Sequence, residues 1–158
     1  MKIDGRCHCG AITYEAEIDP AKVLVCHCTD SQSLSGSAFR VAVPTEGDSF
    51  KLRSGKPKVY VKTTAESGTH RDQAFCPDCG SPIYATSVGE DGPKSYGIRV
   101  GTARQPTELK PTRQVWPEAA FTVVAVTFPA LDVLGLLPKN LAHLGVTSGR
   151  RRGLMRGR

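Results

Sequence analysis

The sequence predicts an all-β domain of several short antiparallel strands, and three observations support this prediction. At 158 residues, 39% of them hydrophobic, the chain is long enough to bury one core. Apolar and polar residues alternate in short runs up to Val100, and none of these runs shows the longer period of a helix. Sixteen Gly and eleven Pro separate the runs, as turns between strands require.

The first predicted strands lie on either side of a wholly apolar run. Ile12–Ile18 alternates apolar and polar side chains, which is the period of a half-buried strand, and Asp19-Pro20 ends it. Val23–Val25 is apolar throughout and is typical of a buried strand. Phe39–Val43 alternates again until Pro44, where we expect the strand to end because proline lacks the N–H that a sheet needs.

Five further strands are predicted between these and Val100. Phe50–Arg53 and Val59–Lys62 flank Ser54-Gly55-Lys56-Pro57, whose composition predicts the turn of a β-hairpin. The remaining predicted strands are Thr69–Phe75, Ile83–Ala85 and Tyr96–Val100.

The sequence changes character near its end, from Ala119 to Leu137, where it becomes strongly apolar. A membrane span is one interpretation, but we predict none, because polar residues and a proline interrupt the run and no positively charged segment precedes it. We predict a buried strand, Phe121–Phe128, and divide the chain into one folded domain, residues 1–128, and an atypical segment, residues 129–158. That segment has weak helical character at first and a disordered basic tail from Gly149.

Five of the six net positive charges of the chain lie in the tail. The last nine residues contain five arginines and no acidic residue, which leaves 16 basic and 15 acidic residues in the rest of the chain. We therefore expect no nucleic-acid-binding face on the folded part. A nucleic acid or another acidic partner would bind through the tail, and the salt dependence of its affinity would reveal this.

Six cysteines call for a decision between disulfides and metal. Met1 to Arg6 contains no apolar stretch of the length that a secretory signal needs, so we expect a cytoplasmic protein in a reducing setting. In that setting, paired cysteines indicate metal binding.

Cys76 and Cys79 form the strongest metal-binding motif. Two residues separate them, one of them proline, and the glycine that follows is free to adopt a positive φ, so both sulfurs can face one ion. The other pair with similar spacing and a flanking glycine is Cys7 and Cys9. We predict one structural zinc on these four cysteines, with reduced buried thiols or a redox pair as the alternative.

Cys26 and Cys28 form a second candidate site, directly after the buried strand. A Cys-x-Cys pair cannot readily form a disulfide in an extended strand, but it can present two thiolates to a metal. An open zinc site usually has three protein ligands, and the candidates for the third are His27, Asp30 and Ser31. Two buried thiols without a metal are the competing interpretation.

Four motifs together resemble a known family, the glutathione-dependent formaldehyde-activating enzymes, whose domain is shared with centromere protein V. In chain order the motifs are Gly5-Arg6-Cys7-His8-Cys9-Gly10, Cys26-His27-Cys28, Ser35-Gly36-Ser37-Ala38-Phe39 and Cys76-Pro77-Asp78-Cys79-Gly80-Ser81-Pro82. Residues 54–60 and 97–102 also match, so the resemblance covers about residues 4–116. Beyond Trp116 the sequence departs from the family's pattern.

The resemblance implies a β-tent fold with a structural zinc on Cys7, Cys9, Cys76 and Cys79 and a catalytic zinc on Cys26, Cys28 and a third cysteine. Here the third position is Ser31, whose neutral hydroxyl is a far weaker zinc ligand than a thiolate. The implied activity is that of a carbon–sulfur lyase, in which zinc activates a small-molecule thiol, glutathione, for addition to formaldehyde or a related aldehyde.

Two other functions are compatible with the same residues. In one, the domain is a zinc-stabilised binding module with a vestigial second site, tethered to an acidic partner by the Arg-rich tail. In the other, it is purely structural, and it then holds one zinc and has no affinity for thiols.

Overall fold

The computed structural model describes residues 1–63, 68–88 and 94–121, and within them the predicted all-β class is confirmed. These residues form ten strands and one α-helix, joined by loops and short 3₁₀ turns. The strands are β1 (Lys2–Arg6), β2 (Thr13–Glu17), β3 (Leu24–Cys26), β4 (Arg40–Glu46), β5 (Phe50–Ser54), β6 (Lys58–Lys62), β7 (Arg71–Phe75), β8 (Pro82–Ser87), β9 (Ser95–Arg99) and β10 (Arg113–Val115), and the helix is α1 (Thr29–Ser35).

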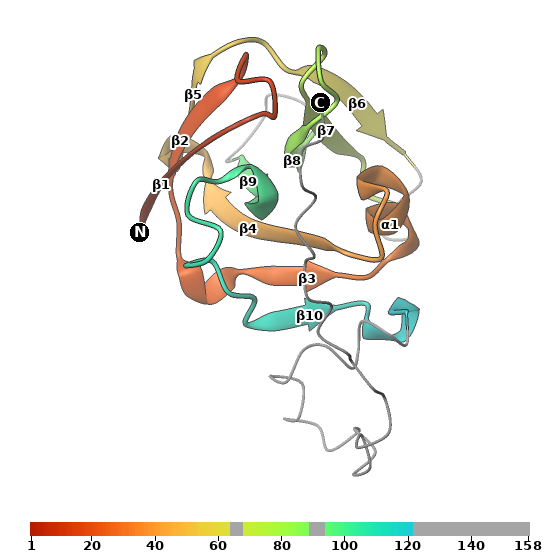
Figure 1. Ribbon diagram of the computed structural model, residues 1–158. Helices are drawn as coiled ribbons and strands as arrows, with labels where there is room; N and C mark the ends of the chain where they lie inside the picture. The colour runs from red at the N-terminus through yellow and green to blue at the C-terminus, as the bar shows by residue number, and fades with distance from the viewer. Residues whose placement is uncertain (64–67, 89–93, 122–158) are drawn as a thin grey trace, which may run out of the picture.

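The strands of the described residues form two open sheets (Figure 1). The small sheet has the order β1-β2-β5, and the large sheet has the order β10-β3-β4-β9-β8-β7-β6. Neighbouring strands are antiparallel except β10 and β3, which are parallel. The chain therefore starts in the small sheet, adds β3 and β4 to the large sheet, and returns to the small sheet with β5 before it builds the rest of the large sheet.

The sequence does not predict β1, β10 or α1, and each lacks the pattern that would reveal it. β1 contains one large apolar residue, Ile3, and β10 has three residues, two of them polar. In α1 the sequence Thr-Asp-Ser-Gln-Ser-Leu-Ser has no apolar period, so its helical form depends on its ends. The side chain of Cys28 caps its start, and Gly36, with φ of 60°, ends it.

The predicted hairpin between β5 and β6 is wrong, because these strands belong to different sheets. The Ser54 hydroxyl donates to the carbonyl oxygen of Ala11 at 3.1 Å, and Gly55 follows with φ of 72°. A Cβ atom on Gly55 would lie 2.5 Å from the same carbonyl oxygen. The bend packs tightly against the loop between β1 and β2, and it directs the chain to the other sheet instead of back along β5 (Figure 1).

The predicted end of the third strand at Pro44 is also wrong, since β4 continues through it to Glu46. β3 pairs with β4 from Arg40 to Ala42, whereas β9 pairs with it from Ala42 to Glu46. Among the described strands, none lies beside the β3 side of β4 after Ala42. The N–H that proline lacks is therefore not needed for the sheet at this position.

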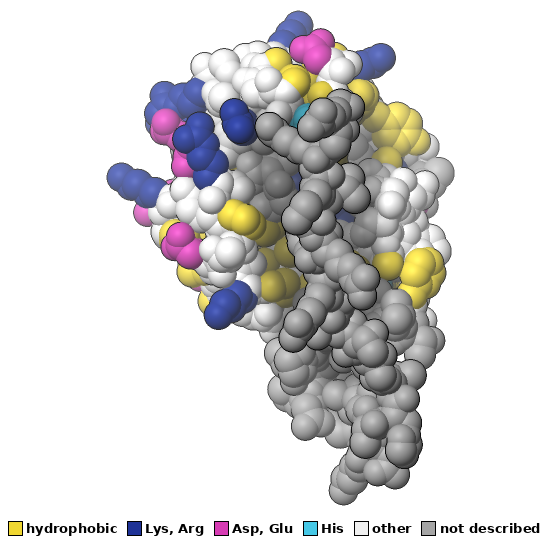
Figure 2. All heavy atoms as spheres, viewed as in Figure 1, with side chains coloured by type: hydrophobic (Ala, Val, Ile, Leu, Met, Phe, Trp, Pro, Cys, Tyr) yellow, Lys and Arg dark blue, Asp and Glu magenta, His cyan; other side chains and the backbone are white. Residues whose placement is uncertain are grey.

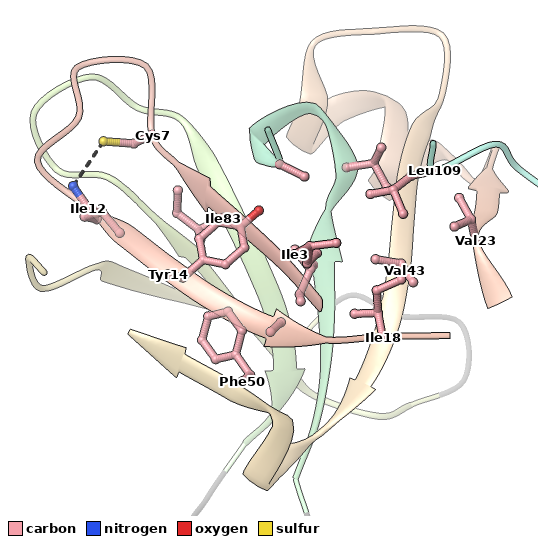
Figure 3. Close-up of a cluster of buried hydrophobic side chains, with 14 of the residues drawn as sticks. Ile3, Cys7, Ile12, Tyr14, Ile18, Val23, Val43, Phe50, Ile83 and Leu109 are labelled. Atoms are coloured by element: carbon pink, nitrogen blue, oxygen red, sulfur yellow. Dashed lines mark hydrogen bonds between the residues drawn. The ribbon is translucent and has the colours of Figure 1, made fainter. Parts of the chain in front are cut away.

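The hydrophobic core lies between the two sheets and joins them (Figure 3). Tyr14 and Phe50 extend from the small sheet, and their ring centroids lie 5.6 Å apart. Phe50 stacks on Tyr96 of β9 at 4.7 Å and meets Tyr84 of β8 edge-on at 5.0 Å. Aromatic pairs of this kind stabilise the packing beyond the area that they bury.

Charges of both signs lie together on the surface. Figure 2 shows Lys and Arg side chains beside Asp and Glu side chains on the face in view. Arg53 pairs with Glu15 at 2.6 Å, and Arg104 pairs with Asp4 at 3.1 Å. The mixture agrees with the near-neutral composition of the chain before its last nine residues.

Several predictions for the end of the chain fall outside the described residues. These are the strand Phe121–Phe128 beyond its first residue, the boundary at residue 128, the weak helical character at the start of residues 129–158, and the basic tail. Within the described part of the chain, no helix has the length and apolar character that a membrane span requires.

Gly5 of β1 provides a test of how closely the strands of the small sheet pack. A Cβ atom there would lie 2.2 Å from Cζ of Tyr14 and 2.6 Å from the carbonyl oxygen of Thr102. The Tyr14 ring is buried, and its hydroxyl is hydrogen-bonded to Thr102, so it cannot move freely. We expect Gly5→Ala to lower the free energy of unfolding by about 2 kcal/mol or more in urea denaturation. Gly101→Ala is the control, because a Cβ there meets no atom within 4 Å; equal midpoints for the two variants would contradict the expectation.

Candidate metal centres

Two β-hairpin loops bring four cysteines together. The loop between β1 and β2 carries Cys7 and Cys9, the loop between β7 and β8 carries Cys76 and Cys79, and their Sγ atoms all lie within 4.8 Å of one another. Cys9 Sγ lies 3.4 Å from Cys7 Sγ and 3.7 Å from Cys76 Sγ, although 67 positions separate Cys9 from Cys76 in the sequence. These four residues, which the sequence predicts to share a metal, are close enough to hold one ion.

Each loop is folded so that its cysteines turn inward. The Gly10 N–H donates to the Cys7 carbonyl oxygen at 3.1 Å, and the Gly80 N–H donates to that of Cys76 at 2.9 Å. Both glycines have positive φ, 84° and 71°, a conformation that residues with a side chain rarely adopt. The Ile12 N–H also donates to Cys7 Sγ at 3.2 Å, a contact that favours the thiolate form (Figure 3).

The four thiols influence one another's ionisation. Hydrogen bonds with Ser81 and with the Cys9 backbone lower the pKa of Cys79 to about 5. The Ala11 N–H lowers the pKa of Cys9, but the thiols of Cys7 and Cys79 outweigh it and raise that pKa to about 12. Ionisation of one thiol therefore opposes ionisation of the next. A divalent cation removes this conflict, so the donor set fits a metal that binds thiolates.

A second cluster forms where β3 ends and α1 begins. The Sγ atoms of Cys26 and Cys28 lie 3.4 Å apart, and Ser31 Oγ lies 3.0 Å from the first and 3.2 Å from the second. The Ser31 N–H donates to Cys28 Sγ at 3.4 Å, so the helix cap and the cluster share one contact. Two thiols and a hydroxyl thus form a small triangle whose donors could contact one ion, with the hydroxyl as the weakest of them.

The pKa values of the two thiols are displaced in opposite directions. Burial raises the pKa of the Cys26 thiol, and the hydrogen bond from Ser31 only partly offsets this. Burial acts in the same sense on Cys28, but its contacts with Ser31 and Cys26 and the charge of Arg40 lower the pKa of Cys28 overall. Cys28 is therefore the thiol that ionises first.

The other predicted candidates for a third ligand lie elsewhere. His27 is fully buried, its Nε2 contacts the side chain of Gln114, and its backbone N–H donates to the Val115 carbonyl oxygen at 3.1 Å. Asp30 Oδ2 lies 2.6 Å from Lys62 Nζ, which ties α1 to β6. Of the three candidates, Ser31 is the one that contacts both sulfur atoms.

Arg40 and Arg99 lie next to the second cluster, and the sequence does not predict them as site residues. Arg40 is the cross-strand partner of Cys26. Arg40 and Arg99 both donate to Gln73 Oε1, at 3.4 and 2.8 Å, and line a cavity of about 350 Å³. Burial, together with the charge of Arg40, lowers the pKa of Arg99 to about 9.

The alternation of side chains in β4 and β9 explains why the sequence does not identify Arg40 and Arg99 as site residues. Arg40 and Arg99 occupy polar positions of the alternating pattern, which normally indicate a solvent-exposed face. In this structure that face forms the wall of the cavity, which Leu34 of α1 also lines. An arginine between apolar neighbours in two predicted strands is the one indication that the sequence offers.

Comparisons with known proteins match the chain to one family model and to a solved structure. The family model described as glutathione-dependent formaldehyde-activating enzyme matches residues 2–119. No curated protein matches the chain. Among solved structures, a Rhodobacter sphaeroides protein aligns with a TM-score of 0.54 and 21% sequence identity over 71% of this chain and 99% of that chain. At this level of identity the likeness shows the fold alone.

We expect Cys76→Ser to destabilise the whole domain, because Cys76 belongs to the cluster that joins the two hairpin loops. Structural zinc contributes on the order of 10 kcal/mol in small domains, which exceeds the low end of whole-domain stability. The variant should lose bound zinc in elemental analysis and lose the cooperative thermal transition in circular dichroism.

Cys28→Ser is the matched control. It removes one thiol from the second cluster and leaves intact the four cysteines that join the two hairpin loops. This variant should keep a cooperative transition near that of the parent. A Cys76→Ser chain that melts cooperatively at the parent temperature would show that the four thiols do not share a structural metal.

Proposed function

Because the chain belongs to the glutathione-dependent formaldehyde-activating enzyme family, we propose that it is a zinc-dependent carbon–sulfur lyase that joins a small-molecule thiol to formaldehyde or a related aldehyde. Glutathione is the expected thiol. The observation that carries this proposal is the triangle of Cys26, Cys28 and Ser31 beside a cavity with cationic walls. The four-cysteine cluster supports a separate, structural zinc.

The reaction forms one bond between sulfur and carbon. The thiol sulfur attacks the carbonyl carbon, the second carbon–oxygen bond opens, and the proton lost by the thiol ends on that oxygen. The thiolate is the nucleophilic form, so catalysis requires a site that favours it at neutral pH. Zinc held by Cys26 and Cys28 would favour the thiolate at neutral pH, because it would lower the pKa of the substrate thiol.

The residues around the triangle of Cys26, Cys28 and Ser31 also favour the thiolate form of a bound thiol. The charge of Arg40 lowers the pKa of Cys28, and it would favour any other thiolate placed beside that residue. Arg40, the cross-strand partner of Cys26, lines the cavity, so a substrate bound there would lie near Cys26 in a limited set of orientations, which favours a reaction between two bound molecules. Cys26 and Cys28 would serve as ligands, and the substrate supplies the sulfur that reacts.

Ser31 weakens this site without disrupting its geometry. Its Oγ atom already lies 3.0 and 3.2 Å from the two sulfur atoms, so a cysteine at the same position would bring a third thiol to the triangle. With two thiolates, zinc should bind weakly, and its other positions would go to water or to an added thiol. We therefore expect the parent to hold about one zinc per chain and Ser31→Cys to raise this toward about two, measured by elemental analysis after gel filtration.

Ser33→Cys is the matched control because Ser33 is exposed on the same helix, where an added thiol cannot join the triangle. It should leave the zinc content unchanged. The rate of exchange between free and hydroxymethylated glutathione, followed by NMR at equilibrium, should rise above the spontaneous rate in the parent and further in Ser31→Cys. If Ser31→Cys binds no extra zinc and neither protein accelerates the exchange, the lyase function is excluded and a structural or binding module takes its place.

A further inference from the structure

We propose that the cavity beside Cys26, Cys28 and Ser31 binds the carboxylate of an acidic thiol through Arg40 and Arg99, an inference that rests on the proposed thiol chemistry. It adds a requirement on the substrate: the thiol must carry a carboxylate. It also assigns a role in specificity to two residues outside the metal-binding motifs.

The register of the large sheet places the two arginines on the same face as a metal-ligand candidate. Cys26 pairs with Arg40, and Ala42, two residues further along β4, pairs with Arg99. Side chains two residues apart in a strand share a face, as do directly paired residues on neighbouring strands. Cys26, Arg40 and Arg99 therefore follow one another across three adjacent strands.

Neither arginine forms an ion pair within the described residues, and the carboxylate whose charge acts on Arg40, that of Asp30, is paired with Lys62. The ion pairs there join Arg53 to Glu15, Lys62 to Asp30 and Arg104 to Asp4. Arg99 is 6% exposed, and its buried Nε has no hydrogen-bond partner in the described structure. Burial of a charge without an opposite charge is costly, so an incoming anion would relieve a cost that the folded chain already carries.

The arginines are held in place so that they can share one anion. Gln73 Oε1 accepts a hydrogen bond from both guanidinium groups, which fixes them side by side and leaves other N–H groups free. A guanidinium matches the two oxygens of a carboxylate in geometry as well as in charge. Neutral thiols at Cys26 and Cys28 leave this positive charge unbalanced, and two thiolates with a zinc dication do the same.

The cavity has room for a small acidic thiol. Its volume of about 350 Å³ is within the range of small-molecule sites, and aromatic residues on its wall can contact an aliphatic stem. Those residues are Tyr60 and Phe75. In the sheet register Gln73 is followed by Ala85 and then by Gly97, where a Cβ atom would lie 3.9 Å from Arg99 Nη1, so Arg99 extends over small residues toward Gln73.

The test compares ligands that differ only in the carboxylate or the thiol. Calorimetric titration of the full-length, zinc-loaded protein would use 3-mercaptopropionate, 2-mercaptoethanol and propionate in a buffer free of phosphate. We expect 3-mercaptopropionate to bind at least about tenfold more tightly than 2-mercaptoethanol, as hydrogen bonds to a charged group predict. Inorganic phosphate should compete less strongly than propionate.

Variants then assign the preference to the arginines. Arg40→Gln and Arg99→Met should each reduce the advantage of the acidic thiol to about threefold or less, with little change for 2-mercaptoethanol. Arg53→Gln is the control, because Arg53 is exposed and paired with Glu15 outside the cavity. This variant should keep the full preference for 3-mercaptopropionate over 2-mercaptoethanol. The ligand comparison on the parent protein tests the inference even if the arginine variants do not fold.

The outcomes separate this inference from the function on which it rests. Equal affinity for the two thiols would overturn the carboxylate site and leave the thiol chemistry standing. Binding of propionate without any gain from a thiol group would support the site and count against the lyase. Stronger competition by phosphate than by propionate would assign the cavity to another anion, and binding of none of these ligands would overturn the inference.

Discussion

The meeting of two hairpin loops at four cysteines is the constraint on which the rest of the structure depends. One loop belongs to the small sheet and the other to the large sheet, so their contact fixes how the two sheets face each other. Closing a loop between Cys9 and Cys76, 67 positions apart, costs conformational entropy. The aromatic packing between the sheets offsets part of this cost, and a metal ion on the four cysteines would offset more. Phe50, which bridges Tyr14 to Tyr96, can pack in this way only when the sheets are held in this relation.

The same strands that build the core also build the candidate site. In β4 and β9, Val43 and Ile98 are paired and belong to the core, whereas Arg40 and Arg99 point to the other face and line the cavity. Because the side-chain period of a strand is two, one strand can serve both purposes without compromise. Regular elements hold a site more rigidly than loops do, and in the second cluster Cys26 lies at the end of β3 while Ser31 lies in α1.

The sequence predicts local features of this fold better than long-range ones. Eight strands follow from alternation and turn residues, and the four-cysteine junction follows from the chemistry of zinc, because ligand type and spacing are local properties. The partner of a strand is not local: Ser54 to Pro57 specifies a bend, but contacts of Ser54 and Gly55 with Ala11 decide that β5 and β6 enter different sheets. Likewise, alternation shows that Arg40 and Arg99 face away from the core, but it cannot show that a cavity lies there instead of solvent.

Ser31 changes the charge of the second cluster as well as its donor atoms. Three thiolates around a zinc dication carry one net negative charge, whereas two thiolates and a neutral hydroxyl carry none. Beside Arg40 and Arg99, a cluster with serine therefore lies in a more positive environment than a three-cysteine cluster would. The cluster with serine lacks a third thiolate and a negative charge beside the arginines. An acidic thiol can supply both, since its sulfur can act as the third thiolate and its carboxylate can bind the arginines. On the proposed function, Arg40 and Arg99 create the preference for anionic thiols, and the neutral hydroxyl of Ser31 both weakens metal binding and strengthens that preference.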